Sequence, residues 1–445
     1  MSSNRINLRE VALSLFAGVF QTIDAETAVQ NAVKLQKSQL HILEETIDLS
    51  DFSEICVVSF GKAAIPMAIG LDKILAGRIT QGLVSAPKRN SRLSSNWKVF
   101  VGGHPVPNKS SLKAAKSTIE LLEKANNPQS LVIFLISGGG SAMLELPKDE
   151  KISLKDLQKT NQILVNCGAT INEINRFRRA ISRIKGGGLS RVCPLARRVS
   201  LVISDTNAGD VKSVASGPTI EDLVSKNLVK EAIEIAEKYK FKNLQPKSVI
   251  EFLESNRDEK IEKTTTSNHS IYTLLDNQIA VESIAESAEK SGFITEIADE
   301  LIENPIEEGC LKLVERLLDL RNKNKGKSVA IISGGEFVCP VRGSGIGGRN
   351  LETVLRCLLE VEKQTTEKLE FAILSGGTDG IDGNSPATGS VVDETTLKRA
   401  KELGFNPEEF LSNSDSYNFF RELGDMIVTG TTGTNVRDVR ILLAR

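Results

Sequence analysis

The sequence lacks the patterns from which disulfide frameworks and zinc sites are built. Its six cysteines include no Cys-x-x-Cys pair, and its three histidines stand far apart, at positions 41, 104 and 269. Disulfide-rich scaffolds need paired cysteines, and structural zinc sites need closely spaced ligands. We therefore expect reduced core thiols in a reducing compartment, the cytoplasm.

Long apolar runs and an excess of charge are also missing. No stretch of about 18 uncharged apolar residues occurs, as a membrane-spanning helix would need. The apolar patch near the N-terminus carries Arg5, Arg9 and Glu10 and is interpreted as a first helix. The formal net charge is −1, which gives no general attraction to nucleic acid or to an acidic membrane. We predict small-molecule partners, and a homo-oligomer stays open.

A Walker A motif is absent as well. The ending Gly326-Lys-Ser is present, but Arg321 stands where the first glycine belongs. Residues 343–348, Gly-Ser-Gly-Ile-Gly-Gly, match G-x-G-x-x-G, yet the next apolar run, 371–374, leads into Ser-Gly-Gly and not into the acidic residue that holds a ribose. Three interpretations stay open: a dinucleotide site, a tight loop without a ligand, and a loop around a nucleotide or acid bound by Arg349.

What the sequence does contain is an alternation of short β-branched runs with longer amphipathic ones. Apolar strands separated by helices predict an α/β fold of parallel sheets with helices on both faces. Candidate strands are 55–60, 82–86, 98–102, 131–136, 199–203, 271–275, 328–332, 371–374 and 426–429. Candidate helices are 109–126, 221–239, 277–291, 307–323 and 351–363.

Two domains are expected, because 445 residues exceed what one hydrophobic core usually supports. A polar, low-complexity segment at 255–269 separates two regions that each have their own alternation of strands and helices. We therefore predict domains at 1–255 and 270–445, of which the second is the smaller.

Glycine, serine and aspartate gather where several candidate strands end. In α/β sheets these carboxyl ends are where ligands bind, and glycine lets backbone N–H groups approach an anion. The corners are SFGKAA, SGGGSAM, ISDTNAGD, SGGE and SGGTDG. They predict a phosphate-handling surface with Lys62 at its mouth, although a lysine there is also an ordinary helix-start residue. Each aspartate is equally well explained as a structural loop residue.

A run of basic residues at 176–185 is followed directly by three consecutive glycines. A basic run is usually a solvated helix face. Because this one leads into a glycine-rich helix start, an anion site is the alternative interpretation.

The ordered motifs resemble the glycerate 2-kinases of the class whose C-terminal portion is called the MOFRL domain. The matching blocks cover nearly the whole chain: FGKAA at 60–64, HPVPN at 104–108, LISGGGSAM at 135–143, SRIKGGGLS at 182–190, ISD with ASGPT within 203–219, SGGE at 333–336, GGRNLE at 347–352, SGGTDGIDG at 375–383 and TGTTGTNVRDVRILL at 429–443. The resemblance implies a Rossmann-like larger domain, a smaller α/β domain, an active site in the cleft between them, and ATP with Mg²⁺ phosphorylating D-glycerate to 2-phosphoglycerate.

The same resemblance implies roles for individual residues. Lys62 and Arg349 match the family's proposed catalytic pair. Asp205 is our third catalytic candidate and Asp210 our candidate metal ligand, and Asp379 could also bind Mg²⁺ or take the hydroxyl proton. Residues expected to bind nucleotide or acid are Gly138, Gly139, Gly140, Ser141, Gly334, Gly335, Glu336, Asn350 and Asp379.

The chain departs from the family pattern at several positions. SDTNAGDVKS replaces a sequence like SDVPGDDPS, which puts the role of Asp210 in doubt. Ala180 replaces a histidine, Leu351 replaces an amide beside Arg349, and TGTTGTN replaces TGPTGTN. Alternatives are therefore an NAD(P)H-dependent hydroxypyruvate reductase, a kinase of a related sugar acid, and a catalytically silent relative. The missing ribose carboxylate and the absence of a histidine suited to relaying a proton count against the reductase.

Overall fold

The computed structural model describes residues 7–89, 92–207, 209–220, 227–240, 246–258, 268–365 and 368–445. They form two compact units: unit 1 contains residues 7–24, 205–207 and 275–445, and unit 2 contains the described residues of 25–204 and 209–274. This division differs from a simple cut between 1–255 and 270–445, because 7–24 and 205–207 group with the C-terminal part. Much of the expected linker, at 259–267, lies outside the described residues.

Unit 2 is built on a six-stranded sheet in the order β6-β5-β4-β7-β8-β9. Its strands are β4 (Glu54–Phe60), β5 (Gln81–Ala86), β6 (Trp97–Val101), β7 (Ser130–Ser137), β8 (Arg197–Ile203) and β9 (His269–Leu275). The strands from β6 to β8 are parallel, as expected from their apolar runs. In chain order they lie 3-2-1-4-5, the Rossmann-like arrangement, so the chain leaves the sheet centre in opposite directions from β4 and β7.

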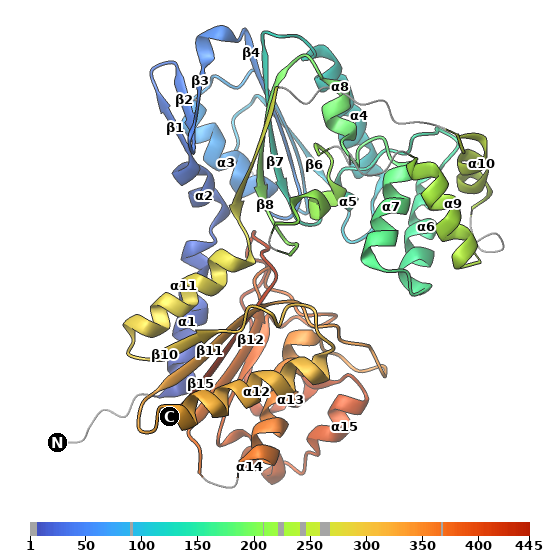
Figure 1. Cartoon of the computed structure of the whole chain (residues 1–445). Helices are drawn as coiled ribbons and strands as arrows, with labels where there is room; N and C mark the ends of the chain where they lie inside the picture. Colours follow the sequence, from blue (N-terminus) through green and yellow to red (C-terminus); the bar gives the residue numbers. More distant parts are fainter. Residues whose placement is uncertain are drawn as a thin grey trace. The chain divides into compact units, whose positions relative to one another are not determined.

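Helices and a small antiparallel sheet complete unit 2. They are α2 (Ala25–Ala32), α3 (Ala64–Leu75), α4 (Lys109–Lys124), α5 (Gly140–Met143), α6 (Leu154–Asn166), α7 (Ile171–Ile181), α8 (Gly188–Val192), α9 (Leu228–Lys238), α10 (Lys247–Ser255), the 3-10 turns η1 (Leu49–Asp51) and η2 (Val211–Ser216), and strands β1 (Val33–Gln36), β2 (Gln39–Ile42) and β3 (Glu45–Asp48). Helices α6, α7, α9 and α10 gather into a separate group with its own apolar core, which includes Phe177 and Phe252 (Figure 1).

Unit 1 has a six-stranded mixed sheet in the order β10-β11-β15-β12-β13-β14. The strands are β10 (Ile294–Ile297), β11 (Val329–Gly335), β12 (Phe371–Gly377), β13 (Gly389–Asp393), β14 (Met426–Ile427) and β15 (Asp438–Ala444). This sheet is mixed, unlike the parallel strands of unit 2, because β15 runs antiparallel to both its neighbours. Its first residue, Asp438, consequently lies opposite Gly335 and Gly377, the last residues of two Ser-Gly-Gly corners.

Helices cover both faces of the unit 1 sheet. They are α1 (Leu8–Thr22), α11 (Asn277–Lys290), α12 (Ile306–Lys323), α13 (Arg349–Gln364), α14 (Thr396–Glu402), α15 (Pro407–Ser412) and α16 (Ser416–Leu423). Ser375 of β12 reaches Asn350 of α13, whereas a side chain at Gly376 would meet Phe16 of α1. Since neighbouring strand residues face opposite ways, α1 and α13 cover opposite faces.

The candidate strands and helices all overlap observed elements, except that 221–226 of one helix lies outside the described residues. The strands β1, β2, β3, β10, β13 and β15 were not predicted. No helix in the described part of the chain is long and apolar enough to cross a membrane.

Candidate functional site

The first candidate region lies in unit 2, where strands β4 and β7 end side by side. The Lys62 N–H donates to the carbonyl oxygen of Gly138 at 2.8 Å, and the Ala63 N–H donates to Ser137 Oγ at 3.0 Å. Gly61 has a φ of 117°, and a Cβ there would overlap Ser137. The two glycine corners are therefore joined at the switch point of the sheet, the place where ligands bind in such folds.

Two side chains that can carry a positive charge, those of Lys62 and His104, lie against this corner. A Cβ at Gly139, whose φ is 77°, would come within 2.9 Å of the His104 ring and 3.3 Å of Lys62 Cγ. The structure thus brings Lys62 together with the predicted residues Gly138, Gly139, Gly140 and Ser141. His104 was not predicted as a site residue, although its motif HPVPN marked the family.

A buried ion pair supports the corner from behind. The Lys185 ammonium pairs with the Glu145 carboxylate, and their side chains are only 1% and 6% exposed. Lys185 Nζ also donates to the Ser141 carbonyl oxygen at 2.9 Å, and the Ser182 hydroxyl donates to Glu145 at 2.6 Å. Burial lowers the pKa of Lys185, while the charge of Glu145 opposes that effect. The pair therefore links residues 182–185 to the glycine corner.

The cations at 176–185 had two interpretations, a solvated helix face and an anion site, and their contacts bear on both. Arg178 donates to Asn161 at 2.7 Å, and Arg179 donates to the carbonyl oxygens of Ser216 and Lys212. Together with Lys185, these cations serve internal contacts. The structure gives no support to an anion site built by them.

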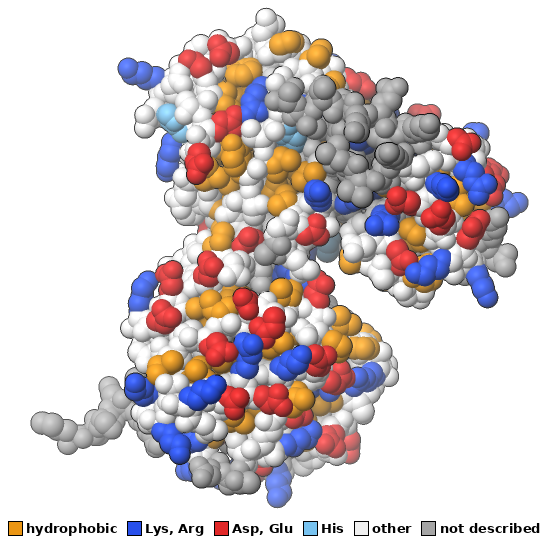
Figure 2. Space-filling view, viewed as in Figure 1, with side chains coloured by type: hydrophobic (Ala, Val, Ile, Leu, Met, Phe, Trp, Pro, Cys, Tyr) orange, Lys and Arg blue, Asp and Glu red, His pale blue; other side chains and the backbone are white. Residues whose placement is uncertain are grey.

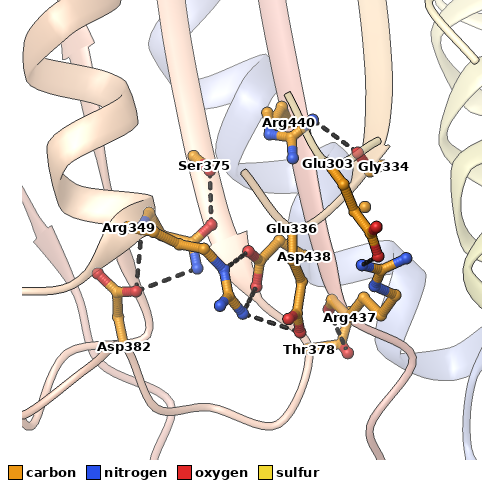
Figure 3. A network of polar contacts seen from close by, with 12 residues as sticks. Glu303, Gly334, Glu336, Arg349, Ser375, Thr378, Asp382, Arg437, Asp438 and Arg440 are labelled. Atoms are coloured by element: carbon orange, nitrogen blue, oxygen red, sulfur yellow. Dashed lines mark hydrogen bonds and ion pairs between the residues drawn. The ribbon is translucent and has the colours of Figure 1, made fainter. Parts of the chain in front are cut away.

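The second candidate region lies in unit 1, at the ends of β11 and β12. Arg349, the first residue of α13, binds Asp438 through Nε and through Nη2, the latter at 3.3 Å. The same Nη2 lies 2.8 Å from Glu336 Oε1. Figure 3 shows Arg349 between Asp382 on one side and Glu336 and Asp438 on the other. One guanidinium is thus shared by two carboxylates.

The electrostatics of this region favour a proton on Glu336. Desolvation of its carboxyl group and the negative charge of Asp438 raise the pKa of Glu336 to about 7, although Arg349 and Arg437 act in the opposite direction. The Glu336 side chain is 34% exposed and that of Asp438 only 4% exposed. Glu336 is therefore the member of the pair that solvent or a ligand can reach.

Asp382 occupies the start of helix α13. Its two carboxylate oxygens accept the N–H groups of Asn350 and Leu351 at 3.0 and 2.9 Å. The Asn350 amide donates to Asp382 at 3.2 Å and accepts from the Ser375 hydroxyl at 2.6 Å. Asn350, predicted to bind a ligand, is 1% exposed and holds the helix start instead of lying open to solvent.

The glycine loop at 343–348 is held by the protein itself. The N–H groups of Ser344 and Gly345 donate to Asn413, that of Ile346 donates to Asp415, and that of Gly347 donates to Asn384. In a dinucleotide-binding loop such groups would face a pyrophosphate. The acceptors of these N–H groups therefore count against the dinucleotide interpretation. A tight loop and a loop beside an acid bound by Arg349 both stay compatible with the structure.

A cavity of about 400 Å³ lies beside this loop in unit 1. Arg349, Asp382 and Asn384 supply polar walls, and Phe337, Pro340, Val341 and Ile381 supply apolar ones. Val341 is 83% exposed, which is unusual for its type. On the face of unit 1 that carries α12, acidic and basic side chains intermingle without a single-sign patch (Figure 2).

The remaining predicted residues are divided between the units. In unit 1, Asp205 accepts from the Asn435 amide at 3.4 Å, and its charge also raises the pKa of Glu336. Asp379 accepts the Ile381 N–H at 3.1 Å. Gly334 and Gly335 pack tightly, since side chains there would meet Asn277 and Ile302. In unit 2, Asp210 directly precedes η2, and its carbonyl oxygen accepts the Ser213 N–H at 3.1 Å.

Two buried arginines of the last strand region were not predicted at all. Arg437 binds Asn207 and, at 2.9 Å, Glu303, and it adopts a positive φ of 71°. Arg440 donates to the carbonyl oxygens of Leu301 and Gly334 and lies 3.5 Å from the centre of the Phe337 ring. The TGTNVRD block marked them only as part of a family motif.

Two of the departures from the family pattern fall in apolar cores. Leu351 is fully buried in the core between α13 and the unit 1 sheet, and Ala180 is fully buried in the core of the α6, α7, α9 and α10 group. Neither side chain lines the regions described above. Their replacement is therefore a change of packing, which weakens the argument for an altered substrate.

Comparison with known proteins identifies the family of this chain. A family model described as a domain of unknown function, DUF4147, matches residues 11–254, and the MOFRL family model matches residues 329–438. A D-glycerate 2-kinase of Thermotoga maritima is 33% identical over 94% of this chain and 99% of its own. A putative hydroxypyruvate reductase of Agrobacterium vitis is 31% identical over 100% of this chain and 96% of its own.

Solved structures give the same result. The crystal structure of glycerate kinase from Thermotoga maritima matches with a TM-score of 0.81 at 29% identity, covering 98% of this chain and 99% of the other. Both the sequence match and the structural match extend over nearly the full length. The chain therefore belongs to the glycerate 2-kinase family.

Proposed function

We propose that this protein transfers the terminal phosphoryl group of ATP to the C2 hydroxyl of D-glycerate. The observation that carries the proposal is the switch point of unit 2, where Lys62 lies against the Gly138–Ser141 corner. Phosphoryl transfer depends mainly on positioning and on neutralising the charge of the phosphates. A lysine beside a glycine-rich strand end supplies both. The D-glycerate 2-kinase of Thermotoga maritima, which is similar over nearly the full chain, supports the choice of acid.

The charges of the two regions suggest different tasks. The unit 2 corner joins the Lys62 N–H to the Gly138 carbonyl oxygen and places the Lys62 side chain beside Gly139. A cation next to a glycine-rich helix start suits the phosphates of a nucleotide. In unit 1 the cation Arg349 is already shared by two carboxylates. We propose that Arg349 serves the same reaction as Lys62 by neutralising the charge of the acceptor acid and of the transferring group. Asp205, a carboxylate, would orient the acceptor by accepting a hydrogen bond from its hydroxyl group.

Magnesium is the usual companion of ATP in such reactions. Among the residues that the structure describes, no three histidine, cysteine, aspartate or glutamate side chains gather in a way that could hold a metal ion. A Mg²⁺ ion would arrive with the nucleotide phosphates, and Asp210 and Asp379 are the proposed carboxylates that would meet it.

A hydroxypyruvate reductase is the second candidate, because a relative carries that name. The loop that would bind its dinucleotide donates the N–H groups of Ser344 to Gly347 to protein acceptors. The strand that follows, β12, ends in Ser375-Gly-Gly and not in an acidic residue. These two observations favour the kinase.

A direct assay tests the proposal. Purified protein is expected to release ADP only when D-glycerate is present, and ³¹P NMR should place the phosphoryl group on O2. NADH consumption with hydroxypyruvate, without glycerate-dependent ADP release, would establish the reductase instead.

Substitution of Lys62 tests its role in that reaction. Lys62→Ala should lower kcat/KM by about 10³-fold, the usual effect of removing a group that stabilises transferring charge. Lys73→Ala is the matched control, because Lys73 lies on α3 but is 55% exposed and pairs with Glu26 on the surface. If Lys62→Ala keeps the wild-type rate with unchanged thermal stability, the central role of Lys62 is wrong.

A further inference from the structure

Two carboxylates, Glu336 and Asp438, share the guanidinium of Arg349. Strand β15 lies between β11 and β12, so its first residue, Asp438, lies beside the last residues of both Ser-Gly-Gly corners. Glu336 follows the first of these corners directly, and its N–H donates to the Ile302 carbonyl oxygen at 2.8 Å. The backbone thus fixes both carboxylates beside the guanidinium of Arg349.

The charges that face Glu336 do not cancel. Arg349 approaches from α13, Asp438 from the start of β15, Arg437 from the position just before β15, and Asp205 from the 205–207 segment. Arg437 also pairs with Glu303, so its charge is shared as well. Arg440, the cation within β15, contacts carbonyl oxygens and an aromatic ring and is turned to the opposite end of this group (Figure 3). Two carboxylates on one guanidinium leave one excess negative charge, which a proton can neutralise.

Two other carboxylates near Arg349 are less suited to accept a proton from a ligand. Both oxygens of Asp382 accept helix N–H groups, and the residue is 2% exposed. Asp438 is 4% exposed and bound by Arg349. Glu336 is 34% exposed and directly follows the carboxyl end of β11.

We propose that Glu336 is the general base of the reaction and accepts the proton of the glycerate hydroxyl. This inference rests on the proposed kinase function. The hydroxyl O–H bond breaks and its proton passes to the Glu336 carboxylate, while the oxygen electron pair forms the new bond to the terminal phosphorus of ATP. The bond from that phosphorus to the ADP oxygen breaks, and its electron pair leaves with ADP. Glu336 then releases the proton to water, and Asp438, which binds Arg349, acts as a positioning residue.

The test compares Glu336→Gln with Glu308→Gln, a matched control in which an exposed glutamate of the same unit, paired with Lys312 on the surface, loses its charge. Glu336→Gln should lower kcat by about 10²–10⁴-fold, the contribution typical of a general base. The KM values for ATP and glycerate should stay within about threefold. Glu308→Gln should keep the wild-type kcat within about the same factor.

The pH profile supplies a readout that a merely structural role would not move. Wild-type kcat should rise with pH through about 7 and then reach a plateau, because the base must be ionised before it accepts a proton. Asp438→Asn removes the repelling charge and should move this rise to lower pH by about one unit. Difference infrared spectra between wild type and Glu336→Gln should show a protonated carboxyl band that disappears across the same range.

The outcomes separate the two proposals. A wild-type protein that does not phosphorylate glycerate overturns the proposed function and the assignment of Glu336 with it. An active wild type together with a Glu336→Gln variant of similar kcat overturns the assignment of Glu336 alone. The assignment of Glu336 is also overturned if the infrared band of its protonated carboxyl group is already absent at pH 5.

Discussion

Removal of one partner from the buried Lys185–Glu145 pair should destabilise unit 2 strongly. Both side chains are almost fully buried, so Lys185→Met leaves an unpaired carboxylate and Glu145→Leu leaves an unpaired ammonium. Breaking such a pair typically costs about 3–5 kcal/mol, whereas replacing both partners with apolar residues of similar size is often neutral or stabilising. We therefore expect the free energy of unfolding of the double variant to lie within about 2 kcal/mol of the wild-type value.

Urea unfolding of the two single variants and the double variant measures this coupling. The matched control is Arg197→Met with Glu45→Leu, an ion pair of the same unit whose side chains are 21% and 22% exposed. Its single variants should each lose only about 1 kcal/mol, because water screens a partly exposed pair. Single substitutions of Lys185 and Glu145 that also lose less than about 1 kcal/mol would refute the reasoning.

The double variant also separates stability from function. Lys185 Nζ donates to the Ser141 carbonyl oxygen at 2.9 Å, and methionine cannot replace that bond. If the pair holds the glycine corner in place, the KM for ATP should rise about tenfold even though the fold is intact. Wild-type kinetics in a stable double variant would show that the pair only stabilises the fold.

Three further predictions concern the glycine corner and the carboxylates of unit 1. Gly139→Ala forces a Cβ into left-handed backbone beside the His104 ring, so kcat/KM should fall at least about tenfold, as steady-state kinetics will show. Asp382→Ala removes the acceptors at the start of α13 and should lower the free energy of unfolding by about 1–2 kcal/mol in urea. The pKa of Glu336 is raised from 4.5 to about 7, so between these pH values the folded state holds a proton that the unfolded state has lost. The contribution of Glu336 to the free energy of unfolding therefore falls as pH rises through this range. The thermal midpoint of Glu336→Gln relative to wild type should therefore increase between pH 5 and pH 7.5, and an unchanged difference would contradict the shift.

The Rossmann-like half of the fold could be predicted because local sequence patterns identify its strands. The strand β7 is apolar at almost every position and is followed by a glycine, so its apolar run and the residue that ends it both indicate a buried strand. Lys62 could be placed at a strand end for the same reason. The family motifs then brought together residues that local patterns only suggested.

The middle strand of unit 1 could not be predicted by the same reasoning. Strand β15 contains Asp438 and Arg440, and charged residues usually indicate an exposed segment. Arg440 is 1% exposed because distant carbonyl oxygens and the Phe337 ring receive its guanidinium. Likewise, Arg349 binds a carboxylate 89 positions away and Lys185 one 40 positions away. Such pairings are tertiary, and no local pattern encodes them.

The central place of β15 constrains how the chain can fold as it is synthesised. Unit 1 gathers α1 from the beginning of the chain and β15 from residues 438–444, with nearly all of unit 2 encoded between α1 and α11. Unit 2 can thus complete its core on the ribosome while unit 1 is still unfinished. Strands β11 and β12 emerge with facing edges that have no partner until β15 is translated. Those edges are open to pairing with other nascent chains during that interval, so the translation of β15 decides whether the sheet closes or pairs with another chain.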